Sequence, residues 1–165
     1  MNNQEVLESI RSLICSSAQN PAWMPQVVSL LRRERSYYHW VGIYLLQGQE
    51  LVLGPYVGKP TPHTRIPLNQ GICGAAASTS QTLIVDDVNA DPRYLACSLE
   101  TRSEIVVPII HKGRVLGEID IDSDQPAAFT PQDRELLEAV ASLIADEAEK
   151  AAGSGHKCLR FKGEG

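Results

Sequence analysis

The sequence predicts an α/β domain of the α+β kind, in which a mostly antiparallel sheet carries helices on its faces. Three observations lead to this fold class. Helical periodicities open and close the chain, β-rich runs between them come in pairs joined by short turns, and a segment of small residues separates the two pairs. Strands joined by short turns pair antiparallel, and the helices must then cover the sheet faces.

The N-terminal part predicts two amphipathic helices and a hairpin. Apolar residues recur with helical spacing in residues 6–14 and, after Pro21, in residues 27–31. From Tyr38 to Leu46 the composition changes to Trp, Val, Ile and Tyr, and a second β-rich run covers Leu51–Val57. Only a short turn containing glycine separates these two runs.

The middle of the chain predicts a loop, a short helix, a short strand and a long polar connection. Three prolines in Gly58–Ile66 exclude a regular helix. The small residues of Gln70–Ala77 suit a short helix packed closely on a sheet, and Thr82–Val85 reads as a short strand. The segment Asp86–Arg102, which contains Cys97, is too long for an ordinary connection and is therefore expected to be functional.

The C-terminal part predicts a second hairpin and a long helix. The β-branched runs Glu104–Ile110 and Val115–Ser123 are joined by a tight turn. Thr130 is the expected N-cap of the helix, with Pro131 at its first position.

Length and composition predict one globular domain. The chain has 165 residues, of which 43% are hydrophobic and 21% charged. We expect this domain to span residues 1–152. Residues 153–165 are rich in glycine and basic residues without a period, which predicts a flexible tail or a remnant of an expression vector.

Charge and hydropathy exclude several functions. The 15 Lys and Arg against 20 Asp and Glu give a net charge of −5, which argues against nucleic-acid partners and anionic membranes. No apolar run is long enough to cross a bilayer, and Glu5 and Glu8 stand where a signal peptide needs basic and then apolar residues. We therefore expect a cytoplasmic protein.

The four cysteines, Cys15, Cys73, Cys97 and Cys158, are expected to be thiols, because structural disulfides are rare in the cytoplasm. None has the spacing of a metal ligand set, so neither a metal nor another cofactor is expected. Basic residues near Cys97, and the predicted helix start near Cys73, would favour a thiolate at each position. The alternative for both is a buried, inert cysteine.

An acidic stripe marks the last predicted strand. Glu118, Asp120 and Asp122 alternate with Ile119 and Ile121, so the acids share one face and the isoleucines the other. If the acidic face meets solvent, it is an ordinary sheet surface. If it lines a pocket, the carboxylates need a cation, either a metal or an amino group. The absence of a calcium-loop or phosphate-loop pattern favours the amino group.

Three other residues are weaker candidates. Trp40 and Tyr44 fall on one face of a strand, where they would wall an apolar slot or serve as core aromatics. Glu104 begins a strand and, taken alone, is equally well a surface acid or an ion-pair partner.

Seven short segments between residues 38 and 145 carry a specific pattern. They are Trp40–Tyr44, Leu53–Tyr56, Thr64–Pro67, Gly71–Gly74, Ala96–Cys97, Arg102–Pro108 and Asp120–Ser123. In order and spacing they resemble the free methionine-(R)-sulfoxide reductases, which are stand-alone GAF domains. The Arg102–Pro108 stretch is shared with GAF domains at large, whereas the cysteines, Glu104 and the aspartate pair are the discriminating residues.

The resemblance implies a set of roles. Cys97 would attack the sulfoxide and become a sulfenic acid, and Cys73 matches one of the family's other cysteines. The sulfenic acid would then condense with a second thiol to a disulfide, which a thioredoxin-like dithiol would reduce. The residues implied to bind the free amino acid are the aromatic wall of Trp40 and Tyr44 and the carboxylates of Glu104, Asp120 and Asp122.

One position departs from the family pattern. Many members have a third, resolving cysteine just before Thr-Arg-Ile, where this chain has His63. Either Cys73 takes over resolution, or an external thiol attacks the sulfenic acid, or the activity has been lost.

The resemblance therefore implies an oxidoreductase that acts on free methionine-(R)-sulfoxide. The alternatives are a non-catalytic GAF module that senses a small molecule and a dimerisation module without a ligand. In each case the first and last helices are candidates for pairing two protomers.

Overall fold

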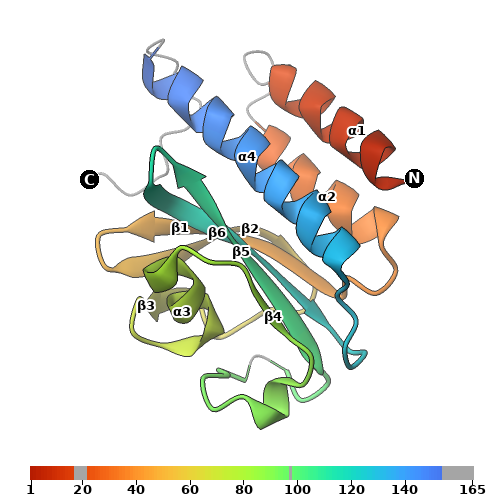
Figure 1. Ribbon diagram of the computed structural model, residues 1–165, viewed down its shortest axis with the longest axis vertical. Coiled ribbons are helices and arrows are strands. Elements are labelled where there is room, and N and C mark those ends of the chain that lie inside the picture. Colours follow the sequence, from red (N-terminus) through yellow and green to blue (C-terminus); the bar gives the residue numbers. More distant parts are fainter. Residues whose placement is uncertain (17–21, 97, 154–165) are drawn as a thin grey trace.

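The computed structural model describes residues 1–16, 22–96 and 98–153 (Figure 1). Its helices are α1 (Asn3–Cys15), α2 (Trp23–Glu34), α3 (Gly71–Thr79) and α4 (Pro131–Gly153), with a 3-10 turn η1 (Val88–Ala90). Its strands are β1 (Trp40–Gln47), β2 (Glu50–Val57), β3 (Arg65–Pro67), β4 (Leu83–Val85), β5 (Ser103–His111) and β6 (Arg114–Ser123). Among the described residues, no helix is both long and apolar enough to cross a membrane.

All six strands form one antiparallel sheet in the order β3-β2-β1-β6-β5-β4. The predicted α+β class and both predicted hairpins are thereby confirmed. The centre of the sheet joins β1 and β6, which are far apart in the sequence. Their register places Trp40 opposite Asp122 and Tyr44 opposite Glu118, so aromatic and acidic residues share this part of the sheet.

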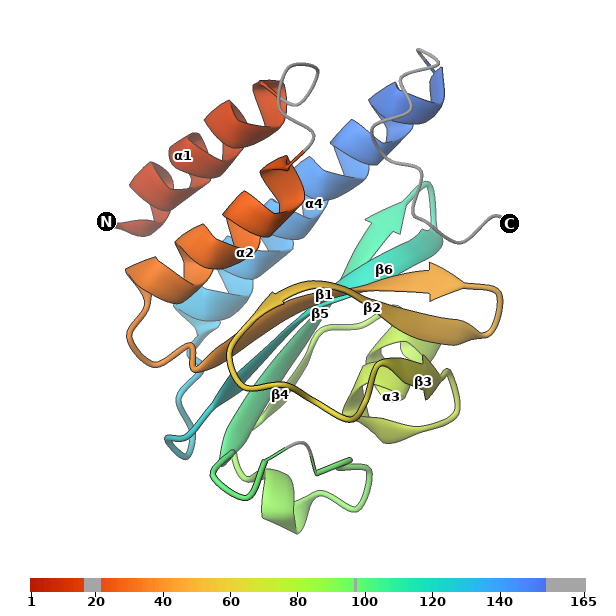
Figure 2. The same cartoon turned by 180° about the vertical axis from the view of Figure 1, so that it is seen from behind.

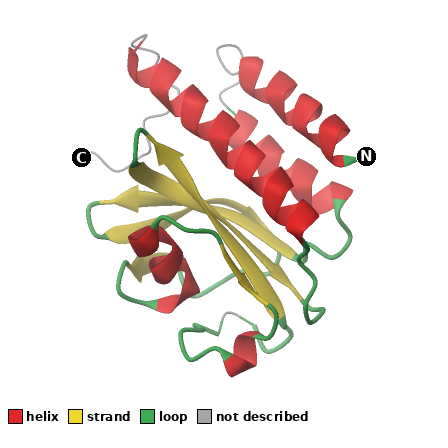
Figure 3. Cartoon of the chain, viewed as in Figure 1, coloured by secondary structure: helices red, strands yellow, loops and turns green. Residues whose placement is uncertain are grey.

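The helices cover the sheet unequally. Helices α2 and α4 pack on one face, α1 lies against both of them, and α3 packs on the opposite face (Figures 1 and 2). The three helices and their side of the sheet enclose a large apolar core. On the α3 side the packing is thinner, and the described residues of the β4–β5 connection are loop apart from the turn η1 (Figure 3). This thinner side is where the candidate site forms.

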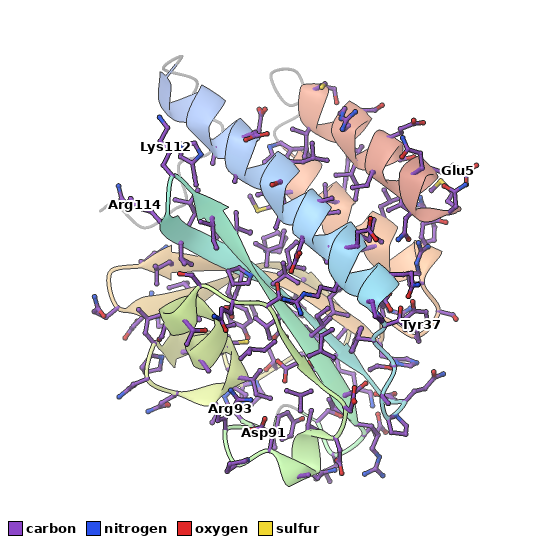
Figure 4. All side chains as sticks on the ribbon, viewed as in Figure 1. Glu5, Tyr37, Asp91, Arg93, Lys112 and Arg114 are labelled. Atoms are coloured by element: carbon purple, nitrogen blue, oxygen red, sulfur yellow. The ribbon has the colours of Figure 1, made fainter. Side chains whose placement is uncertain are left out.

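The start of α4 is fixed by a buried carboxylate. Asp133 accepts hydrogen bonds from the hydroxyls of Tyr37 and Tyr38, both at 2.6 Å, and from the backbone N–H of Thr130 at 2.9 Å. The Thr130 hydroxyl in turn caps the N–H of Asp133 at 3.4 Å, as the predicted N-cap requires. Burial and the Asp133 carboxylate raise the pKa of Tyr37, labelled in Figure 4, to about 12, so its hydroxyl remains a donor.

Asp133→Ala is expected to lower the free energy of unfolding by about 3 kcal/mol, since each buried donor left unpaired costs about 1–3 kcal/mol. Tyr38 is fully buried and would lose its hydroxyl partner. Urea unfolding measures the change, and Asp146→Ala, at an exposed position of the same helix, is the matched control. Equal stability of the two variants would contradict the role given to Asp133.

Candidate functional site

Alternation along β6 separates the acids from the isoleucines. Glu118, Asp120 and Asp122 are 0%, 4% and 5% exposed on the face toward α3. Ile119 and Ile121 lie on the opposite face, within the core that the three helices cover. The predicted alternation is confirmed, and the acidic face is buried, so it is not a solvent-exposed sheet surface.

Two further elements bring functional groups to these acids. Glu104, on β5, lies opposite Asp122 in the register and is 5% exposed. Cys73, in the first turn of α3, places its Sγ 3.9 Å from Oε1 of Glu104. Ligating atoms of Cys73, Glu104 and Asp120 all lie within 4.8 Å of one another. Three elements distant in sequence therefore converge on one buried cluster.

The cluster borders a small cavity, here called the inner cavity. It is lined by Tyr44, His63, Ile66, Gly71, Ile72, Cys73, Leu95, Glu104 and Asp120. The Tyr44 hydroxyl donates to the backbone oxygen of His63 at 2.7 Å, which holds the preceding loop against the sheet. The cavity offers about 20 Å³ to water, enough for one water-sized occupant and too little for an amino acid.

Trp40 and Asp122 border a second space, here called the outer pocket. This pocket is about 330 Å³ and is lined by Arg32, His39, Trp40, Gly58, Lys59, Pro60, Thr61, Ser98, Glu100, Thr101, Asp122 and Asp124. Trp40 donates from Nε1 to the backbone oxygen of Lys59 at 3.0 Å and stacks on Tyr56 with ring centroids 5.6 Å apart. The structure thus divides the sequence-predicted residues between two neighbouring spaces.

Described residues of the β4–β5 connection line both spaces. Leu95 lines the inner cavity, whereas Ser98 and Glu100 line the outer pocket. Cys97, the predicted nucleophile, lies outside the described residues, but its neighbours on both sides border the site. Next to it, the backbone oxygen of Ala96 lies 3.1 Å from Nε2 of His63.

Sequence reasoning treated His63 only as a departure from a pattern. The sequence did not predict that His63 lies at the inner cavity, because the proline-rich loop before it has no periodicity that would show which way its side chains point. The ion pair between Lys59 and Glu100, which spans the outer pocket, was missed for the same reason.

The buried carboxylates of β6 have raised pKa values and oxygens without hydrogen-bond partners. Burial raises the pKa of Glu118, Asp120 and Asp122, and the neighbouring charge of Asp120 raises the pKa of the other two further. Both carboxylate oxygens of Glu118 and one oxygen each of Asp120 and Asp122 have no hydrogen-bond partner. Among the described residues, no lysine or arginine lines the inner cavity. The site therefore favours the binding of a cation.

The electrostatics around the cysteines differ from the sequence-based expectation. Burial, followed by the charges of Asp120, Glu118 and Glu104, raises the pKa of the Cys73 thiol well above its ordinary value. The expected thiolate at this helix start was therefore wrong, because burial and the nearby carboxylates both disfavour the charged form of the thiol. Arg93, one of the basic residues near Cys97, is paired with Asp91, with Nη2 2.7 Å from Oδ2 (Figure 4).

The raised carboxyl pKa values predict a pH-dependent stability. Above the unfolded-state pKa of about 4, the native state still holds protons that the unfolded chain has lost, so stability falls as pH rises. Asp120→Asn removes one such group and should flatten the fall in unfolding free energy as pH rises above about 4. Urea unfolding at a series of pH values measures it, with exposed Asp146→Asn as control. Identical slopes for Asp120→Asn and wild type would contradict the prediction.

The chain resembles known proteins over most of its length. Residues 12–147 match the family model for the GAF domain. The free methionine-R-sulfoxide reductase of Saccharomyces cerevisiae is 39% identical over 158 residues, which cover 87% of this chain and 86% of the yeast protein. The Escherichia coli protein of the same name is 37% identical over 123 residues, 74% of each chain.

A solved structure agrees with these matches. The free methionine-R-sulfoxide reductase of Neisseria meningitidis, solved in complex with its substrate, superposes with a TM-score of 0.86 at 35% identity. The match covers 92% of this chain and 91% of that one.

Proposed function

Because this chain belongs to the free methionine-R-sulfoxide reductase family of GAF domains, we propose that it reduces free methionine-(R)-sulfoxide to methionine. The observation that carries the proposal is the buried cluster of Glu104, Asp120 and Cys73, which combines a thiol with two carboxylates, of which Asp120 has an oxygen that lacks a hydrogen-bond partner. Such a cluster fits a substrate that brings its own positive charge, and a free amino acid does so through its ammonium group.

Substrate binding requires the two spaces to join. The inner cavity is too small for an amino acid, whereas the outer pocket beside Trp40 has the size of a small-ligand site. Leu95 borders the inner cavity, and Ser98 and Glu100 border the outer pocket, so the two spaces are proposed to become one site when the substrate binds. In this site the carboxylates of Glu104, Asp120 and Asp122 hold the ammonium group, and the rings of Trp40 and Tyr44 flank the methyl sulfoxide.

The proposed chemistry begins at Cys97. Its thiolate attacks the sulfoxide sulfur, and the sulfoxide oxygen takes up one proton and passes to the cysteine sulfur. Methionine is released and Cys97 becomes a sulfenic acid. The oxygen needs an acid within reach. Asp120 suits that role, because burial raises its pKa.

Cys73 is proposed to resolve the intermediate. Its thiol attacks the sulfenic sulfur, a disulfide forms and the oxygen leaves as water. The raised pKa of Cys73 makes a base necessary, and Oε1 of Glu104 lies 3.9 Å from its Sγ. A thioredoxin-like dithiol in the cytoplasm then reduces the disulfide.

A turnover assay tests this function. With a dithiol reductant, free methionine-(R)-sulfoxide should be converted, and the (S) epimer should be a poor substrate. The sulfoxide within a peptide should also be a poor substrate, because it lacks the ammonium group that the carboxylates recognise. Equal rates on free and peptide-bound sulfoxide would contradict the proposed recognition. No turnover together with tight binding of another small molecule would favour the sensing module.

A further inference from the structure

We propose that Cys73, Glu104 and Asp120 form a binding site for a divalent transition-metal ion, with Zn²⁺ as the fitting ion. The spacing of cysteines and histidines in the sequence predicts no such site. The tertiary structure creates it, because α3, β5 and β6 each contribute one ligand, and the three ligating atoms lie within 4.8 Å of one another.

The separation of the ligand atoms is close to that expected around a tetrahedrally coordinated Zn²⁺ ion. Bonds of about 2.3 Å to sulfur and about 2.1 Å to oxygen at the tetrahedral angle separate the two ligand atoms by roughly 3.6 Å. The distance between Sγ of Cys73 and Oε1 of Glu104 is 3.9 Å, so a small side-chain adjustment suffices. The inner cavity offers about 20 Å³, which accommodates one ion-sized occupant.

Unpaired buried oxygens provide an independent reason to expect a cation here. Asp120, 4% exposed, has an oxygen without a hydrogen-bond partner. Glu118, two residues away on the same face of β6, is fully buried with both oxygens unpartnered. Uncompensated carboxylates in a buried site are costly, and a divalent ion would offset their charge.

The sulfur ligand from Cys73 determines which class of metal ion fits the site. Mg²⁺ and Ca²⁺ prefer six or more oxygen ligands, whereas a thiolate with two carboxylates suits Zn²⁺. When the ion binds, the Cys73 thiol loses its proton to solvent and a metal–sulfur bond replaces the S–H bond. Three protein ligands leave a fourth position for water.

Bound Zn²⁺ would also block the substrate, and this consequence rests on the proposed function. Glu104 and Asp120 cannot hold the ion and the ammonium group together. Zn²⁺ at ten times its dissociation constant should therefore raise the apparent KM about tenfold and leave kcat unchanged, as for simple competition.

Titration with Co²⁺ tests the site directly. Chelator-treated, reduced protein should bind one Co²⁺ per chain with near-ultraviolet absorption from thiolate-to-cobalt charge transfer, and Zn²⁺ should displace the cobalt. Cys73→Ser should lose this absorption, whereas Cys15→Ser, at an exposed cysteine on α1, should keep it. Absence of the absorption in wild type, or its persistence in Cys73→Ser, would overturn the proposal.

A second variant covers the case in which Cys73→Ser does not fold. Asp120→Asn keeps the thiol and the side-chain volume but removes a charged ligand, so Co²⁺ affinity should fall by more than about tenfold. Unchanged affinity would count against the site. Because binding is read from absorption, an inactive protein that binds cobalt would refute only the reductase proposal. An active protein without the absorption would refute only the metal site.

Discussion

Cys97→Ser is expected to abolish the reduction of free methionine-(R)-sulfoxide, whereas Cys73→Ser should still complete one turnover. In the proposed mechanism the sulfur attack needs only Cys97, and the second thiol acts after methionine has left. Without reductant, wild type and Cys73→Ser should each release about one methionine per active site, and Cys97→Ser none. Quantifying methionine after a single-turnover incubation measures the difference.

The control for this experiment is Cys15→Ser, which removes an exposed thiol on α1 and should behave as wild type. If Cys97→Ser retains activity, the nucleophile is another residue. If Cys73→Ser loses even the first turnover, Cys73 takes part in the attack or in substrate binding, and the assigned order of events is wrong.

Asp120→Asn is expected to lower kcat/KM for the free amino acid by about 10–100-fold, because a hydrogen bond between charged groups contributes about 1.5–3 kcal/mol. Unfolding does not explain such a loss, since removal of an uncompensated buried carboxylate should make the protein more stable at neutral pH. Steady-state kinetics and urea unfolding on the same sample measure both effects.

Asp146→Asn, at an exposed position on α4, is the matched control and should change neither quantity. A variant at Asp120 that is both less active and less stable would indicate a structural role. Undiminished kcat/KM would remove Asp120 from the recognition of the ammonium group.

The sequence determined which side chains of β6 share a face. Strand alternation is a local property, so Ile119 and Ile121 had to lie opposite the acids whatever the rest of the fold. The same applies to the cap at Thr130 and to both hairpins, because each depends on residues close in the chain.

Which face of the strand is buried, and against what, was decided by the tertiary structure alone. A strand with acids on one side fits a solvent-exposed surface as well as a pocket, and only the packing of α3 on β5 and β6 settles the choice.

The pKa of the Cys73 thiol was also decided by the tertiary structure. Its helix start suggested a thiolate, but the pKa depends on carboxylates that lie 31 or more positions away in the chain. The spacing of residues in the sequence determines local geometry. The burial and the pKa of a side chain depend on all the residues that the fold places around it.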